Sequence, residues 1–166
     1  MIKGEIAAFL PNIRSSHNVG SIFRTSDALG ISKIFLAGYT PCPVDRFQRV
    51  QKEIAKTALG AEKNIPWEYI KDIPGCFKKL KKEGYLVVGI EQDGKSIDYK
   101  KFKLNKVLKE SGYTKVVFVV GNEVDGLSQK EKSFCDYIVE IPMKGEKESM
   151  NVVVSFGIAV SRILNV

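Results

Sequence analysis

The amino-acid sequence predicts an α/β fold, with a mainly parallel sheet flanked by helices, in a single domain spanning residues 1–166. Short apolar runs alternate with segments of helical periodicity, which is the order typical of parallel α/β domains. The run Lys115–Val120 is apolar throughout its interior, as expected for a central strand covered on both faces. A length of 166 residues suits one domain with its own hydrophobic core.

Six short apolar runs are expected to be strands. In chain order they are Glu5–Leu10, Lys33–Ala37, Trp67–Ile70, Tyr85–Ile90, Lys115–Val120 and Tyr137–Ile141. Pro11 ends the first run, and a loop with Gly38, Pro41 and Pro43 follows the second.

Four segments are expected to be helices. They are Asn18–Leu29, Arg46–Ala58, Asp72–Lys82 and Ser149–Leu164. Gly30, Gly60 and Gly84 follow the first three, where a C-terminal glycine is expected. In the last segment, Val152–Val154 favours a strand by propensity, but the length of the apolar stretch favours a buried helix.

The chain is basic, with 26 Lys+Arg against 19 Asp+Glu, a net charge of +7 and a pI near 9.3. This balance indicates either a polyanionic partner, RNA or DNA first, or simple solubility. Lysines gather in two stretches, residues 78–82 and 100–109. Each stretch is either an ordinary solvated face or an RNA contact.

Metal, disulfide and membrane roles are not expected. Cys42, Cys76 and Cys135 lack C-x-x-C spacing and His17 is the only histidine, so neither a zinc site nor a disulfide framework is predicted. Met1–Glu5 does not begin a signal peptide, and no apolar stretch reaches the roughly 18–20 residues that span a bilayer. We therefore expect a cytoplasmic protein without a membrane partner.

The first polar motif, Asn12–Arg24, joins the first strand to the first helix. Loops at the carboxyl ends of parallel strands are where α/β sheets place ligands. Helical spacing puts Gly20, Arg24 and Asp27 on one face, opposite the apolar one. The simpler interpretation is structural: Asn18 caps the helix and Arg24 pairs with Asp27 on the surface.

The second motif, Gly121–Ser128, directly follows the most apolar strand. Its two glycines, Gly121 and Gly126, would let the backbone approach a bound molecule closely. The simpler interpretation is an ordinary strand-to-helix turn capped by Ser128.

The third motif, Ile141–Val152, joins the last strand to the terminal helix. Ser149 is a candidate cap for that helix. Asn151 is harder to explain structurally, because a polar amide near the start of an apolar helix needs hydrogen-bond partners.

Taken in order, the three motifs resemble those of the SpoU (TrmH-type) branch of the SPOUT RNA methyltransferases. That family carries Asn-x-Gly…Arg first, Gly-Asn-Glu…Gly-Leu-Ser second, and Ile-Pro-Met…Ser-(Leu/Met)-Asn-(Val/Leu) third. Each motif alone is unspecific, but the ordered set is specific and covers Glu5–Leu164. Many relatives carry an additional N-terminal RNA-binding domain, and this chain resembles the minimal, single-domain form.

The resemblance implies a C-terminal deep trefoil knot, which pattern alone could not predict because true knots are nearly absent from proteins. It also implies a homodimer with sites completed across the interface, and S-adenosyl-L-methionine (AdoMet) as cofactor. In the family, backbone groups and apolar walls hold the adenosine, in keeping with the absence of a G-x-G-x-x-G fingerprint here. The implied AdoMet-binding residues are Ile90, Gly121, Asn122, Ile141, Met143, Gly145 and Met150.

The implied reaction is methyl transfer to a ribose 2′-hydroxyl of RNA, and the family's key arginine corresponds to Arg24. A guanidinium group stays protonated in proteins, so Arg24 is expected to bind the adjacent phosphate and stabilise the forming alkoxide. The general base that removes the ribose proton is not assigned. By resemblance, Asn18, Glu123, Ser149 and Asn151 complete the site. No metal is needed for this chemistry.

Three alternatives remain open: methylation of a base atom, an RNA-binding module without activity, and a basic scaffold that is not an enzyme. Among acceptors, analogy with minimal relatives favours tRNA over rRNA.

Overall fold

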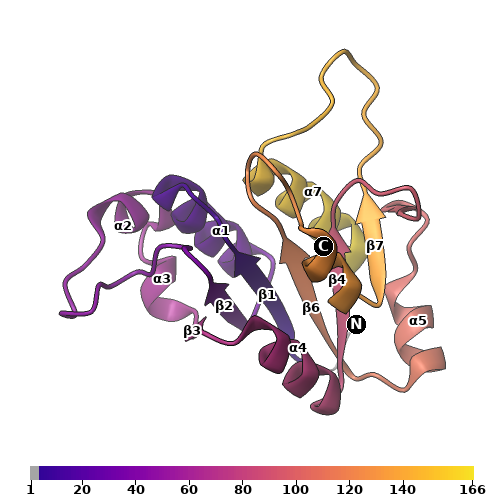
Figure 1. Ribbon diagram of the computed structural model, residues 1–166, viewed down its shortest axis with the longest axis horizontal. Coiled ribbons are helices and arrows are strands. Elements are labelled where there is room, and N and C mark those ends of the chain that lie inside the picture. The colour runs from indigo at the N-terminus through magenta and orange to yellow at the C-terminus, as the bar shows by residue number, and fades with distance from the viewer. Residues whose placement is uncertain (1–3) are drawn as a thin grey trace.

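A sheet of seven parallel strands forms the middle layer of the computed structural model, which describes residues 4–166 (Figure 1). The strands are β1 (Ile6–Pro11), β2 (Lys33–Ala37), β3 (Trp67–Ile70), β4 (Tyr85–Ile90), β5 (Ile97–Asp98), β6 (Lys115–Val120) and β7 (Tyr137–Glu140). Their order is β3-β2-β1-β6-β4-β7-β5. The predicted parallel α/β fold is confirmed. Among the strands, the two-residue β5 was not expected. Three short helices, over Ala61–Asn64, Leu104–Ser111 and Gln129–Phe134, were not among the expected helices either.

Helices cover both faces of the sheet (Figure 1). They are α1 (Ser16–Ala28), α2 (Lys52–Ala58), α3 (Ala61–Asn64), α4 (Ile73–Lys82), α5 (Leu104–Ser111), α6 (Gln129–Phe134) and α7 (Val152–Leu164). Because successive side chains of a strand point to opposite faces, β6 contributes to two cores. Phe118 packs on the face covered by α1 and α7, and Val119 on the face covered by α4 and α6. The apolar run of β6 is buried on both sides, as predicted.

Two predicted helix caps were wrong, although the helices themselves form. Helix α1 begins at Ser16, and its cap is Ser15, whose hydroxyl accepts from the backbone N–H of Asn18. Helix α7 begins at Val152 and is capped by Asn151 rather than by Ser149. In each case the cap is the residue whose non-helical backbone aims its side-chain oxygen at the first free N–H groups.

The helix expected over Arg46–Ala58 was too long, because α2 begins only at Lys52. The carboxylate of Asp45 accepts hydrogen bonds from the backbone N–H groups of Phe47 and Arg49, at 2.8 and 3.0 Å. A short acidic side chain that bonds the backbone ahead of it stabilises a turn in place of a helix. Residues 44–50 therefore form a closed turn that precedes α2.

Gly20 packs α1 against α2 and does not belong to an exposed polar face, contrary to the sequence expectation. It is buried, and a Cβ atom at this position would lie 2.1 Å from Thr57 Oγ1 and 2.4 Å from the Ile54 carbonyl oxygen. The missing side chain lets the two helices approach closely. The expected surface pair is not seen either, since no ion pair joins Arg24 to Asp27 within residues 4–166.

Strand β7 lies between β4 and β5, although β4 and β5 follow one another along the chain. Residues 91–96 therefore connect two strands that flank a third from much later in the sequence. The trefoil knot itself stays a prediction. In the described part of the chain, no helix combines the length and the apolarity that crossing a membrane requires.

Candidate active site

A cavity opens at the carboxyl edge of the sheet, beyond β4, β6 and β7 and beside the start of α7. It encloses about 190 Å³, and the exposed loop over residues 142–150 forms part of its wall. The cavity is lined by Ile90, Glu91, Gln92, Gly121, Asn122, Glu123, Val124, Asp125, Gly126, Glu140, Ile141, Met143, Ser149, Met150, Val152 and Ser155. This is the edge at which parallel α/β sheets place their ligands.

Most of the residues expected to bind a cofactor share this cavity. The lining includes Ile90, Gly121, Asn122, Ile141, Met143 and Met150. Gly145 is not among the lining residues; it lies in the exposed loop, with open space where a side chain would be. The backbone approaches closely at Gly121, where a Cβ atom would lie 2.2 Å from the Gly126 carbonyl carbon.

The side chain of Asn122 organises the loops around the cavity. Its oxygen accepts from the backbone N–H groups of Val124 and Asp125, at 2.7 and 3.0 Å. Its amide nitrogen donates to the Asn12 carbonyl oxygen at 2.9 Å and to the Tyr39 hydroxyl at 2.7 Å. Asn122 thereby joins the loop after β6 to the loops after β1 and β2.

Glu123 joins the second motif to the first. One carboxylate oxygen accepts from the Ser15 backbone N–H and the Asn18 side-chain amide, both at 2.9 Å, and the other accepts from the Arg14 backbone N–H at 2.8 Å. Partial burial raises the pKa of Glu123, but these donors outweigh burial and hold the pKa below its ordinary value. Glu123 is therefore an anionic anchor at the start of α1.

Asn151 extends this connection to the third motif. Its oxygen accepts from the backbone N–H groups of Val153 and Val154, and its nitrogen donates to Asn18 Oδ1 at 3.3 Å. Ser149 lies close by in the chain and lines the cavity. Asn18, Glu123, Ser149 and Asn151, which the sequence analysis assigned to one site, thus gather at one side of the cavity.

Arg24 is the exception among the expected catalytic residues. It lies on the exposed side of α1, six residues beyond Asn18, which corresponds to a rise of roughly 9 Å along the helix. It lines a different depression, formed by α1, α2 and α7, that also includes Lys56, Thr57 and Gly157. Within one chain, Arg24 is not part of the cavity.

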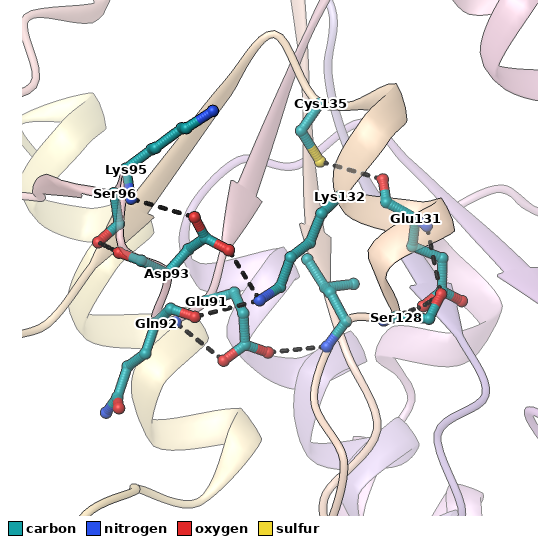
Figure 2. Close-up of polar contacts among 10 residues, drawn as sticks. Glu91, Gln92, Asp93, Lys95, Ser96, Ser128, Glu131, Lys132 and Cys135 are labelled. Atoms are coloured by element: carbon teal, nitrogen blue, oxygen red, sulfur yellow. Dashed lines mark hydrogen bonds and ion pairs between the residues drawn. The ribbon is translucent and has the colours of Figure 1, made fainter.

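Glu91 and Gln92 follow β4 and line the cavity. The resemblance implied the segment after Ile90 as part of the cofactor site, but neither residue was named individually. Glu91 Oε2 accepts from the Leu127 backbone N–H at 2.8 Å, and Gln92 Nε2 donates to the Glu148 carbonyl oxygen at 2.6 Å. In Figure 2, the segment after β4 faces Lys132 of α6, which forms an ion pair with Asp93 at 3.0 Å. The position of Glu91 and Gln92 directly after the buried strand β4 was the signal that could have identified them.

The cavity is acidic although the chain carries a net charge of +7. Four carboxylate residues line it, Glu91, Glu123, Asp125 and Glu140, and its lining contains no lysine or arginine. Apolar side chains supply the remaining walls, among them Ile141, Met143 and Met150. Such a lining favours a ligand with an apolar ring system and a positive charge.

The fold and the cavity define a parallel α/β protein with a ligand site built from three strand-end loops. The family model of the SpoU rRNA Methylase family matches residues 5–161, and the chain belongs to this family. It is 32% identical over 152 residues to a 23S rRNA (guanosine-2'-O-)-methyltransferase RlmB of Neisseria meningitidis serogroup B, covering 92% of this chain and 55% of that protein.

Solved structures agree with the fold. An AdoMet-bound rRNA methyltransferase from Sinorhizobium meliloti superposes with a TM-score of 0.83 at 26% identity, over 98% of this chain and 56% of that one. A TrmH/SpoU tRNA modifying enzyme from A. aeolicus gives a TM-score of 0.79 at 22% identity, over 97% of this chain and 74% of that one. The chain spans about half the length of the curated relatives it matches.

Proposed function

We propose that this protein transfers a methyl group from AdoMet to a ribose 2′-hydroxyl of RNA. The observation that carries the proposal is the joining of Asn18, Glu123 and Asn151 by hydrogen bonds beside an acidic, apolar-walled cavity. The Neisseria meningitidis relative is named for 2′-O-methylation of guanosine in 23S rRNA, and the Sinorhizobium meliloti structure contains AdoMet. Both names support the same chemistry here.

The cavity lining suits AdoMet. Ile90, Ile141, Met143 and Met150 would contact its adenine, and backbone groups near Gly121 would hydrogen-bond it. AdoMet carries a net positive charge, whereas the product left after methyl transfer does not, so the carboxylates around the cavity favour the cofactor over its product. When bound, AdoMet supplies an electrophilic methyl group with a good leaving group already attached.

Glu123 is poorly suited to act as the base that removes the ribose proton. Both of its carboxylate oxygens already accept N–H donors, and the resulting lowered pKa makes it a weak proton acceptor. Its proposed role is to position Asn18 and the start of α1. Asn18, Ser149 and Asn151 would then orient the ribose.

We propose that Arg24 acts as a cation on the neighbouring phosphate and the forming alkoxide, in the site of a second copy within a homodimer. Its distance from its own cavity supports this assignment. The outer face of α7 leaves Val154 and Ile158 exposed, at 48% and 39% of their surface, and supplies apolar area for a dimer contact.

The acceptor is proposed to be tRNA, with rRNA as the alternative. Relatives carry both names: the A. aeolicus structure is called a tRNA modifying enzyme, and the Neisseria meningitidis relative a 23S rRNA enzyme. The lining of the cavity does not distinguish them, because it would contact the cofactor and a single nucleotide.

The test is methylation of total RNA from a strain that lacks the gene, with labelled AdoMet and mass-spectrometric mapping of the modified nucleoside. Label on a ribose 2′-oxygen of tRNA is expected. Label on a base atom would refute ribose as the acceptor, and label on rRNA would select the alternative substrate. Absence of AdoMet binding in calorimetry would refute the enzyme and favour an RNA-binding module.

A further inference from the structure

The turn over residues 44–50, here called the Phe47 turn, presents an aromatic ring to solvent between two arginines. The Phe47 side chain is 62% exposed, and the guanidinium carbons of Arg46 and Arg49 lie 4.7 and 5.1 Å from its ring centroid. The loop that carries the turn projects away from the sheet between β2 and α2, at the left of Figure 1. Burial of apolar surface does not account for this phenylalanine.

The turn is held in one conformation by Asp45. Its carboxylate accepts from the backbone N–H groups of Phe47 and Arg49 and pairs with the Arg49 side chain at 2.7 Å. Val44 and Val50 form an antiparallel bridge that closes the base of the turn. Gln48 adopts a φ of 61° at the tip. A turn whose backbone is held this way loses little backbone conformational entropy when its exposed ring binds a partner.

The turn is also connected to the proposed active site. It belongs to the loop that leaves the carboxyl end of β2, the edge of the sheet where the cavity opens. The same loop begins near Tyr39, whose hydroxyl accepts a hydrogen bond from Asn122 of the cavity lining. A polymer that enters the cavity with one residue can therefore extend along this edge toward Phe47.

We infer that the Phe47 turn binds an unpaired nucleotide of the RNA substrate, with the base stacked on Phe47 and the adjoining phosphate on Arg46. This inference rests on the proposed function, which supplies RNA as the partner. Unpaired bases stack on aromatic rings and on arginine planes, whereas paired bases are not accessible for stacking. Asp45 holds Arg49 in an ion pair, while no ion pair engages Arg46 within residues 4–166. The Arg46 guanidinium lies over the Phe47 ring, so a base that takes its place on the ring leaves Arg46 free to bind the adjoining phosphate.

The experiment measures the affinity of the full chain for a fluorescent stem–loop RNA and for a fully paired duplex of equal length. Phe47→Ala and Phe47→Leu are expected to lower stem–loop affinity by about tenfold or more, because stacking on an aromatic ring is lost. Duplex affinity should stay near wild type, and Phe47→Trp should restore stem–loop binding. Phe47 is exposed, so these variants keep the fold, which circular dichroism verifies.

Arg46→Gln tests the phosphate contact. This substitution should lower the affinity for both the stem–loop and the duplex. It should also reduce the slope of log affinity against log salt concentration by about one. Lys63→Gln, which removes an exposed charge in the last turn of α3, outside both lysine stretches, is the matched control and should have a smaller effect. If the two substitutions have equal effects, Arg46 contributes only to the overall positive charge, and the proposed contact with a specific phosphate is refuted.

Three results would overturn the role of Phe47: unchanged stem–loop affinity in Phe47→Ala, equal loss for stem–loop and duplex, or a change in the sedimentation mass of the protein. The last would make the turn a contact between two copies of the chain. AdoMet calorimetry on the same samples separates this inference from the proposed function. If the chain binds no AdoMet but its RNA binding still depends on Phe47, the proposed methyltransferase function is refuted and the role of Phe47 in RNA binding stands.

Discussion

The side-chain amide of Asn151 donates a hydrogen bond to the amide oxygen of Asn18 over 3.3 Å, although the two residues are 133 positions apart in the sequence. At the same time, Asn151 Oδ1 caps α7 and Asn18 Nδ2 donates to Glu123. Since each amide has its oxygen and nitrogen engaged by different partners, the network fixes one orientation for both. The three sequence motifs meet in this single chain of hydrogen bonds.

The two functions of Asn151 can be separated by substitution. Asn151→Asp keeps an oxygen for the α7 cap but removes the donor to Asn18, so we expect near-normal stability and methyl transfer reduced by about 10- to 100-fold. Asn151→Ala removes both functions and should also lower the free energy of unfolding by about 1 kcal/mol. Urea unfolding and a methyl-transfer assay measure the two effects. Wild-type activity in Asn151→Asp would contradict the positioning role.

Glu123 should make the free energy of unfolding fall at acidic pH. Because its folded-state pKa is lowered, its stabilising contribution is present above the ordinary carboxyl pKa of about 4.3 and is lost as pH falls through the lower folded-state value. Glu123→Gln should therefore destabilise the protein at neutral pH and reduce the loss of stability between about pH 5 and pH 3. Urea titrations across this range measure both. Glu146→Gln, on the exposed loop, is the control, and an equal response of the two variants would refute the prediction.

Arg24 is expected to act across a dimer interface, which mixing of variants can test. Arg24→Ala and Asn151→Asp should each be poorly active alone. When the two exchange subunits, a mixed dimer regains one intact site, and activity should recover to about one quarter of wild type. If Arg24 serves the cavity of its own chain, no mixed dimer contains an intact site and activity stays low. AdoMet binding by Arg24→Ala, measured in parallel, should remain normal.

Gly20 should be required for helix packing. Gly20→Ala places a methyl group against the Ile54 carbonyl oxygen, so the free energy of unfolding should fall by about 1–3 kcal/mol or more. Gly94→Ala is the matched control, because open space surrounds that position, and it should change stability little. Equal stability of the two variants would show that α1 and α2 tolerate a wider separation.

Local pattern was sufficient for most of the fold. The apolar runs identified β1, β2, β4 and β6, because burial between two helical layers imposes a continuous apolar sequence. The expected strands β3 and β7 also form, although both are partly exposed and each contains a glutamate. The caps were harder: Ser15 and Asn18, or Ser149 and Asn151, stand a few residues apart and carry equivalent oxygens. Only the backbone conformation decides which oxygen reaches the first N–H groups of the helix.

The sequence by itself determined the parallel α/β architecture, the position of three polar motifs after buried strands, and the family to which they belong. Only the tertiary structure decided which motif residues meet. Asn18, Glu123 and Asn151 come together because β1 lies beside β6 and the third motif returns from β7 to the same edge of the sheet. Arg24 is excluded because it lies farther along α1, outside the cavity. Hydrogen-bond partners more than 100 residues apart depend on strand order, which no local periodicity encodes.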